Sequence, residues 1–467
     1  MNNRRGAGDL TCGPITGTML RFAFPMILGN LLQQLYNVAD TLIVGQFIGA
    51  DALAAVGSSY TLMTFLTSIL LGLCMGSGAV FSIRCGEKDE EGLKDSILHS
   101  FLMIAGLAVV LNAAVFLLMD PILHFLQVPD GIYGMMREYL WIIFMGILAT
   151  FLYNFYASLL RAVGDSVTPL IFLGVCALLN IVLDLVFVIR FRWGVAGAAG
   201  ATVIAQFVSG VGLLIYTWSR FPTYRIFQEK IRLKRRIFRE IGQFSFLTCL
   251  QQSVMNLGIL MVQGLVNSFG TVVMAAFAAA VKIDSFAYMP VQDFGNAFST
   301  FTAQNYGARK AERIRKGIKS AVGCSVLFCL VISAVVWLFA EPLMLLFVRP
   351  EETEILLVGV QYLRIEGACY CGIGCLFLLY GFYRAVERPG MSVVLTIISL
   401  GTRVVLAYVL SSVPVIGVTG IWWSVPIGWL LADVAGFIYY RIKKTVLLRT
   451  DPGGMEEGGG SALKCSK

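Results

Sequence analysis

Residues 178–186 read LLNIVLDLV and lie within an apolar segment, 168–189, in which Asp184 is the one charged residue. Asn180 and Asp184 are four residues apart, so on a helix they share one face. A carboxylate near the middle of a membrane span costs about 2.5–3.5 kcal/mol even on insertion scales. A second acid, Asp40, lies in an equally apolar run nearer the N-terminus. Two acids in two apolar spans, one of them beside an amide, indicate a proton or cation site inside a helical membrane bundle.

The composition is typical of a polytopic α-helical membrane protein. Of 467 residues, 57% are hydrophobic and 14% are charged, whereas soluble domains carry about 25% charged residues. Apolar runs of about 20 residues recur and are long enough to cross a bilayer as helices. The twelve expected spans are 15–47, 53–80, 95–119, 135–160, 167–190, 195–218, 240–266, 273–303, 317–340, 356–384, 391–411 and 417–441. We therefore expect an all-α integral membrane protein with twelve transmembrane helices.

Basic residues gather in two of the connections between these spans. Residues 220–239 and 307–319 together contain fourteen Lys and Arg, whereas 120–134 contains none and 341–355 contains only Arg349. Short cytoplasmic loops carry the excess of Lys and Arg, so both termini are expected in the cytoplasm and the chain in the plasma membrane. Because topology explains the basic residues, no nucleic-acid partner is expected. With two His and no nucleophile or phosphate-loop motif, neither an enzyme nor a cofactor is expected.

The second half of the chain repeats the first. The segment from Gly86 to Ile97 aligns without gaps on 307–318, at an offset of 221 residues. Arg161-Ala162-Val163 recurs at 384–386 and Gly194-Val195 at 417–418, both at an offset of 223. An even number of spans per repeat gives both halves the same topology, so we expect two six-helix bundles related by a pseudo-two-fold axis along the membrane normal.

The repeat sets the expected domain limits. An N-terminal six-helix lobe at 1–218 contains the ion site, and a basic cytoplasmic linker follows at 219–240. A C-terminal six-helix lobe covers 241–445, and the glycine-rich tail at 446–467 is expected to be disordered.

The buried polar set exists only in the first repeat. On the repeat register Asp40 corresponds to Met261, Asn180 to Arg403, Asp184 to Ala407 and Thr202 to Val425. A purely structural role should have survived in both bundles more evenly. The asymmetry favours an ion site in the N-terminal lobe over a buried structural hydrogen bond.

The chain resembles the multidrug and toxic compound extrusion (MATE) transporters, over nearly its whole length up to about residue 445. The motifs are Phe24-Pro25, Tyr36-Asn37-Val38-Ala39-Asp40, Arg161-Ala162-Val163-Gly164-Asp165, Asn180 with Asp184, Gly194 to Gly200, and Ala303-Gln304-Asn305-Tyr306-Gly307-Ala308. The resemblance implies a secondary antiporter that exports organic, often cationic compounds in exchange for protons or sodium by alternating access. Small organic substrates and membrane lipid are then the expected partners, and the transporter is expected to act as a monomer.

The resemblance also implies roles for individual residues. The ion-coupling residues it implies are Asp40, Asn180, Asp184 and Thr202, with Tyr139 and Asn154 extending the network. It links Pro25 to helix bending on protonation; a permanent kink is the equally weighted alternative. Another branch of the family has an acid in the seventh span, where this chain has Gln251-Gln252, so a C-terminal-lobe cation site of that kind is not expected.

Three polar residues on the first span lie one or two turns from Asp40, on its face: Gln33, Tyr36 and Asn37. They are candidates for the wall of a substrate cavity, with simple helix–helix hydrogen bonding a comparable alternative. Sodium could be bound by the oxygens of Asp40, Asn180, Asp184 and Thr202, whereas protons need only the two carboxylates, so both ions remain candidates. A flippase for a lipid-linked precursor is the alternative function, although it should line its cavity with several Arg or Lys, and here Arg403 and Lys282 are nearly alone.

Overall fold

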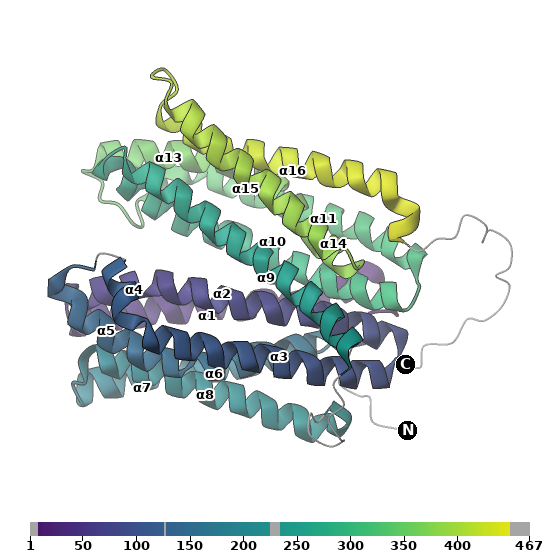
Figure 1. Cartoon of the computed structure of the whole chain (residues 1–467). Helices are drawn as coiled ribbons and strands as arrows, with labels where there is room; N and C mark the ends of the chain where they lie inside the picture. Colours follow the sequence, from purple (N-terminus) through teal and green to yellow (C-terminus); the bar gives the residue numbers. More distant parts are fainter. Residues whose placement is uncertain (1–7, 126–127, 225–233, 449–467) are drawn as a thin grey trace, which may run out of the picture. The chain divides into compact units, whose positions relative to one another are not determined.

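The structure, a computed structural model, describes residues 8–125, 128–224 and 234–448, and within these ranges the chain is helical and contains no β-strand (Figure 1). The segment 225–233, which holds part of the expected linker, lies outside the described residues. So do residues 449–467, which make up most of the expected tail.

Twelve candidate membrane spans are present in the described part of the chain, as predicted. Ten are single long helices: α1 (Ile15–Phe47), α2 (Ala50–Glu87), α3 (Glu90–Leu117), α7 (Val167–Asp184) continued by η1 (Leu185–Arg190), α8 (Gly194–Arg220), α9 (Arg235–Asn267), α10 (Thr271–Gly307), α11 (Ala311–Leu338), α15 (Pro389–Ser411) and α16 (Val418–Leu447). Two are bent pairs: α5 (Asp130–Met145) with α6 (Ile147–Ala162), bent by 44°, and α13 (Thr353–Gly367) with α14 (Tyr370–Ala385), bent by 52°. The short elements are α4 (Met119–Phe125), η2 (Pro222–Tyr224) and α12 (Ala340–Met344).

The sequence repeat is also present in the backbone. The two bent pairs are the fourth span of each half and break at equivalent places, Gly146 and residues 368–369. The left-handed residues at the connections recur in pairs at the same offsets of 221 to 223. These pairs are Gly49 with Gly270, Lys88 with Arg309, Gly164 with Glu387, and Gly194 with Gly417. Helix boundaries at equivalent positions in the two halves thus carry a positive-φ residue, in agreement with the sequence repeat.

The described residues form two compact units. Unit 1 contains residues 28–85 and 89–249 together with Gly8, and unit 2 contains residues 9–27, 86–88 and 250–448. Three segments are grouped differently from the expected lobes: 9–27 and 86–88 belong to unit 2, and 241–249 belongs to unit 1. Their contacts give the reason, since Leu10 is bonded to Gln304 in unit 2, whereas the Ser77 and Ser245 hydroxyls are 2.9 Å apart in unit 1.

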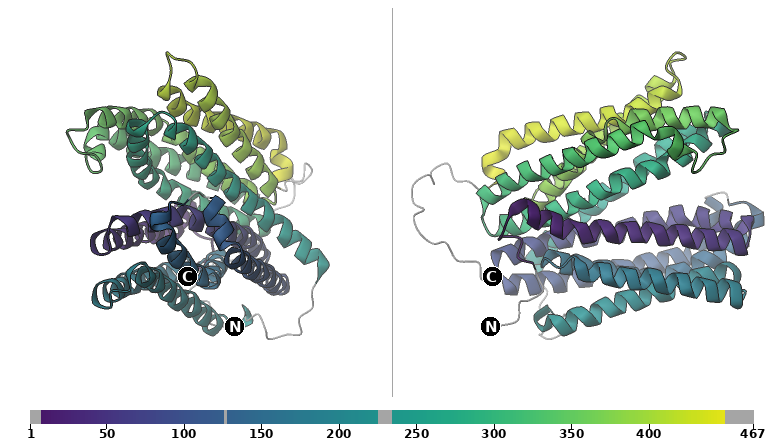
Figure 2. Two further views of the ribbon diagram at one scale, coloured as in Figure 1. Left: turned by 60° about the vertical axis from the view of Figure 1, so that its left-hand side comes forward. Right: turned by 180° about the vertical axis from the view of Figure 1, so that it is seen from behind.

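Unit 1 is held together by long helices that run side by side along a common direction (Figures 1 and 2). Its core includes fully buried aromatic rings, among them Phe81 and Phe155, whose rings meet edge to face with centroids 6.0 Å apart. On α2, Gly72 and Gly76 lie against the start of α9, where a Cβ on either would come within 2.6 Å of a backbone Cα, that of Cys249 or Ser245. Small residues spaced by four let two membrane helices approach this closely.

Unit 2 packs around its bent span. The Phe277 and Trp422 rings are stacked with centroids 5.5 Å apart, and Tyr362 meets Trp422 edge to face at 4.9 Å. Gly381 on α14 allows close contact with α10, because a Cβ there would lie 2.5 Å from the carbonyl oxygen of Gly295. These contacts place the face of α13 that carries Glu366 inside the unit.

Candidate ion-binding site

The polar face of α7 ends where the helix changes its hydrogen-bonding pattern. Asp184 is the last residue of α7, and the following turn, Leu185–Arg190, is a π-helix. In the second repeat the corresponding helix, α15, continues as an α-helix to Ser411. π-Helical turns are rare and occur frequently at functional sites. The π-helical turn after Asp184 therefore distinguishes α7 from its counterpart α15. Hydrophobic periodicity in the sequence did not predict this turn.

Asn180 connects α7 to α8. Its Nδ2 donates a hydrogen bond to Thr202 Oγ1 at 3.2 Å, and the exposed fractions of the two side chains are 1% and 8%. Asp184, one turn further along α7, is fully buried. The structure thus brings three of the predicted residues, Asn180, Asp184 and Thr202, into the interface between two helices of unit 1.

Asp40 on α1 joins this group, because its carboxyl group interacts directly with that of Asp184. Neither oxygen of Asp184 has a hydrogen-bond donor, and neither Asp40 Oδ1 nor Asn180 Oδ1 has one. An ionised carboxylate accepts hydrogen bonds but cannot donate one. Two adjacent acids can therefore satisfy each other only when a proton or a cation lies between them.

The oxygen atoms available at this place suit a proton or a hard cation such as sodium better than a transition metal. Buried polar groups are normally hydrogen-bonded, so four buried oxygens without a donor identify a place that a positive group would complete. All four are carboxylate or amide oxygens, the ligand type of hard cations. Within the described ranges no group of three or more His, Cys, Asp or Glu is arranged to hold a metal ion. These four oxygens belong to Asp40, Asn180 and Asp184, and the hydroxyl oxygen of Thr202 is bonded to Asn180 beside them. The role predicted for Asp40, Asn180, Asp184 and Thr202 as sodium ligands stays a prediction.

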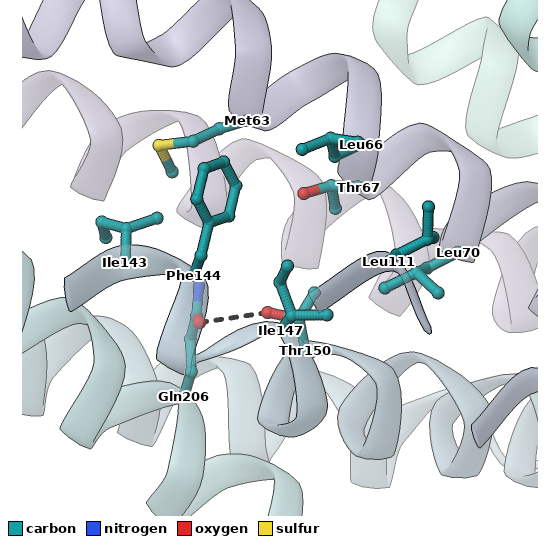
Figure 3. A pocket seen from close by; sticks show the side chains of 10 residues that line it. All are labelled: Met63, Leu66, Thr67, Leu70, Leu111, Ile143, Phe144, Ile147, Thr150 and Gln206. Atoms are coloured by element: carbon teal, nitrogen blue, oxygen red, sulfur yellow. Dashed lines mark hydrogen bonds between the residues drawn. The ribbon is translucent and has the colours of Figure 1, made fainter. Parts of the chain in front are cut away.

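Tyr139 lies beside the acid pair, whereas Asn154 belongs to a neighbouring network. Tyr139 is 3% exposed and is within electrostatic range of both acids. Asn154 Nδ2 donates to the carbonyl oxygen of Thr150 at 2.8 Å, and the Thr150 hydroxyl donates to Gln206 Oε1 at 3.0 Å (Figure 3). The role predicted for Asn154 in extending the ion site stays a prediction.

A small cavity of about 30 Å³ lies beside the bend of the fourth span, between residues of α2, α3, α5, α6 and α8 (Figure 3). Its lining residues are Met63, Leu66, Thr67, Leu70, Leu111, Ile143, Phe144, Ile147, Thr150 and Gln206. This volume is enough for a water molecule, which needs about 10–15 Å³ on the same measure. The candidates for a cavity wall on α1 are not among these residues.

Those candidates have local contacts on α1. Gln33 is exposed, Tyr36 interacts with Gln33 and lies near Asp40, and Asn37 Nδ2 donates to Gln34 Oε1 at 3.2 Å. α1 is continuous from Ile15 to Phe47 and passes through Pro25 without a break. The roles predicted for Gln33, Tyr36, Asn37 and Pro25 stay predictions.

Unit 2 contains a second pair of buried acids, which the sequence reasoning missed. Asp284 on α10 is 5% exposed and Glu366 on α13 is 1% exposed. Tyr370 donates to Asp284 Oδ1 at 2.6 Å, and Tyr362 donates to Glu366 Oε2 at 2.9 Å. The charge of Arg403 acts on both carboxyl groups.

Arg364 is two residues from Glu366 in the sequence, but its guanidinium lies over the Trp337 ring, 5.5 Å from the ring centroid. On the repeat register, Asp284 and Glu366 correspond to Met63 and Phe144, two residues that line the cavity of Figure 3. A search for acids of the second repeat that correspond to apolar residues in the first would have revealed the second pair.

Long apolar helices, a twofold repeat and buried acids inside the spans define a polytopic helical membrane transporter. The family model described as MatE matches residues 25–186 and 245–409. The chain is 31% identical to the probable multidrug resistance protein YpnP of Bacillus subtilis (strain 168). The alignment extends over 446 residues and covers 93% of this chain and 97% of that protein. The chain belongs to the MATE family, a family of transporters rather than of enzymes.

Solved structures share the fold. A MOP superfamily transporter from Pyrococcus furiosus superposes with a TM-score of 0.89 at 23% identity, covering 96% of this chain and 99% of that chain. An outward-facing structure of a multidrug resistance MATE family transporter gives a TM-score of 0.88 at 23% identity, with the same coverage. These neighbours agree with the predicted architecture of twelve helices in two bundles.

Proposed function

We propose that this protein is a secondary antiporter that exports organic compounds in exchange for protons or sodium by alternating access. The observation that carries the proposal is the contact between Asp40 and Asp184, two acids from different spans whose buried oxygens lack donors. Membership of the MATE family and a relative named as a probable multidrug resistance protein support export of small organic compounds.

The acid pair gives the coupling its physical basis. Two close negative charges cannot both stay ionised cheaply in a medium of low dielectric, so the pair takes up a proton or a cation. Occupancy changes the net charge of the buried site and therefore the relative free energies of the conformations that expose it to either side. One positive charge that moves inward across 100 mV releases about 2.3 kcal/mol. That is enough for a gradient of roughly fifty-fold in a neutral substrate.

The two coupling ions use the site differently. A proton would bind one carboxyl oxygen of Asp40 or Asp184 and would need no other ligand. Sodium would in addition draw on Asn180 Oδ1, which lacks a donor, and on Thr202 Oγ1, which keeps a lone pair free while it accepts from Asn180 Nδ2. Removal of the Thr202 hydroxyl should consequently distinguish the ions.

A flippase for a lipid-linked precursor is less well supported. Such a transporter needs cationic side chains available to a diphosphate, and the candidates inside the C-terminal spans are Arg403 and Lys282. In unit 2 Arg403 is within electrostatic range of two buried acids, Asp284 and Glu366. This arrangement favours an exporter of neutral or cationic compounds. We further propose a plasma-membrane location with both termini in the cytoplasm, and transport by a single copy of the chain.

Proteoliposomes test the proposal directly. The purified protein is reconstituted, a proton gradient or a sodium gradient is imposed separately, and the movement of ethidium, a fluorescent organic cation, is followed. Transport driven by one gradient and abolished by its dissipation is the expected result. Ethidium movement that ignores both gradients, or movement of a fluorescent lipid in its place, would exclude the antiporter.

A further inference from the structure

The motif Ala303–Ala308 lies at the end of α10, and its polar side chains hydrogen-bond to a segment near the N-terminus. Gln304 and Asn305 are 2% and 0% exposed. Gln304 Oε1 accepts a hydrogen bond from the backbone N–H of Leu10 at 3.1 Å, and Asn305 Nδ2 donates to the Leu10 carbonyl oxygen at 3.2 Å. One buried amide pair thus binds both backbone groups of a residue almost three hundred positions earlier.

We name residues 9–13 the N-terminal strap. The carbonyl groups of residues 10–13 accept hydrogen bonds from two cationic side chains of unit 2. Arg313 donates to the carbonyl oxygens of Gly13 at 2.7 Å, Cys12 at 2.6 Å and Leu10 at 3.2 Å. Lys310 Nζ donates to the Thr11 carbonyl oxygen at 2.8 Å. Four consecutive carbonyl groups are therefore held by charged donors or by the buried Asn305.

Two more features hold the strap in place. Leu10 is 2% exposed, so this residue is buried as well as hydrogen-bonded through its backbone. Partial burial raises the pKa of Asp9, but hydrogen bonds from Thr11 and the charge of Lys310 outweigh burial, and the pKa of Asp9 lies below its usual value. Asp9 is accordingly ionised at neutral pH and accepts the Thr11 N–H at 2.8 Å. The strap then leads directly into α1, whose Thr16 hydroxyl lies 2.6 Å from that of Ser320.

Unit 1 binds the start of α9 at the positions that correspond in the repeat. Arg84, the counterpart of Asn305, donates to Glu240 at 3.0 Å. His99, the counterpart of Ser320, accepts the backbone N–H of Lys234 at 2.8 Å. Each unit therefore fastens the entry to the first helix of the other repeat, by different side chains at equivalent places. A feature that recurs in both halves with different chemistry indicates that the fastening itself matters.

We propose that the N-terminal strap anchors the start of α1, the helix that carries Asp40, to unit 2, and that Arg313 is the positioning residue of this anchor. α1 is grouped with unit 2 up to Ile27 and with unit 1 from Leu28 onward. An anchored start makes the first half of α1 follow unit 2, while Asp40 stays in unit 1. The anchor deepens the proposed function, since it ties the helix of the ion site to the second unit.

The first test measures the strap itself and does not depend on transport. In a variant that keeps Cys12 and has its other cysteines replaced, the rate of maleimide labelling reports how often the strap opens. Arg313→Gln should raise this rate about tenfold or more, because it removes hydrogen bonds from a charged donor that are worth about 1.5–3 kcal/mol each. Lys316→Gln, an exposed change on the same helix, should leave the rate unchanged. Equal labelling of Cys12 with and without Arg313 would refute the anchor.

The second test asks whether anchoring serves transport. Arg313→Gln should slow ethidium export in proteoliposomes with little change in KM. In a cysteine-free background that carries Arg313→Gln, cysteines at Thr11 and Lys310 joined by a bifunctional maleimide should restore export. The same protein left without the cross-linker is the control. Export that stays low after cross-linking would show that Arg313 acts in another way. Failure of every variant, including the unmodified protein, to export would count against the proposed function and not against the strap.

Discussion

Asn180 donates its Nδ2 hydrogen bond to Thr202 Oγ1, and this one bond fixes which end of the Asn180 amide is left over. The remaining Oδ1 is buried without a donor, as are both oxygens of Asp184. The amide therefore adds an acceptor to a site that already has an excess of acceptors. A positive group is the natural occupant of such a site.

Replacement of either acid should uncouple the transporter. Asp40→Asn and Asp184→Asn should each reduce gradient-driven ethidium export to the level of empty liposomes, because an amide cannot exchange charge with the gradient. Substrate binding to the detergent-solubilised protein should be retained. The matched control is Asp51→Asn, an exposed acid in the first turn of α2. An Asp40→Asn or Asp184→Asn variant that inserts normally and exports at the original rate would remove that acid from the mechanism.

Thr202→Val should separate sodium from proton coupling. Valine is the residue at the corresponding position of the second repeat, Val425, so the substitution is compatible with the fold. Loss of one oxygen ligand is worth about 0.5–1.5 kcal/mol, which corresponds to up to about a tenfold loss in sodium affinity. Export driven by a proton gradient should be nearly unchanged. Comparable losses under both gradients would assign the hydroxyl a structural role instead.

Labelling of introduced cysteines should establish the orientation. Single cysteines at Arg236 and Lys316, both exposed, should resist a membrane-impermeant thiol reagent in intact cells, because they lie in the two basic connections. A cysteine at Gly131, in a connection without Lys or Arg, should react readily. The reverse pattern would invert the proposed topology.

Close packing of α2 on α9 should make Gly76 intolerant of a side chain. In Gly76→Ala the new Cβ would lie 2.6 Å from the Ser245 Cα, so one helix must move. Overpacking of this kind costs about 1–3 kcal/mol or more. The apparent melting temperature in detergent should fall accordingly. Gly106→Ala on α3, where a Cβ meets nothing within 4 Å, should not lower it.

The second acid pair should depend on its tyrosine donors. Tyr370→Phe leaves the buried Asp284 carboxyl without its 2.6 Å hydrogen bond, which should destabilise the protein by about 1–3 kcal/mol. Tyr408→Phe, at a residue that is 49% exposed, is the control and should have no effect on the melting temperature. An unchanged melting temperature in Tyr370→Phe would mean that another donor takes over at Asp284.

Local chemistry made the architecture readable from the sequence. Apolar length sets where a helix can cross a bilayer, so the expected span 15–47 coincides with α1 and the expected span 391–411 falls within α15. The repeat was visible because helix ends need particular residues, such as the glycines at 194 and 417 that adopt positive φ in both halves. The bend at Gly146 was not predicted, since hydropathy is the same in a straight and in a bent apolar helix.

The sequence by itself determined the helical membrane class, the twelve spans, the repeat and the cost of each acid in an apolar run, all of which depend on neighbouring residues or on a constant offset. Only the tertiary structure decided which acids meet. Asp40 reaches Asp184 across unit 1, and Glu366 joins Asp284 instead of its sequence neighbour Arg364. Partners of this kind are set by how helix faces rotate and pack. A sequence pattern specifies how apolar a helix face is, but not which face of another helix packs against it.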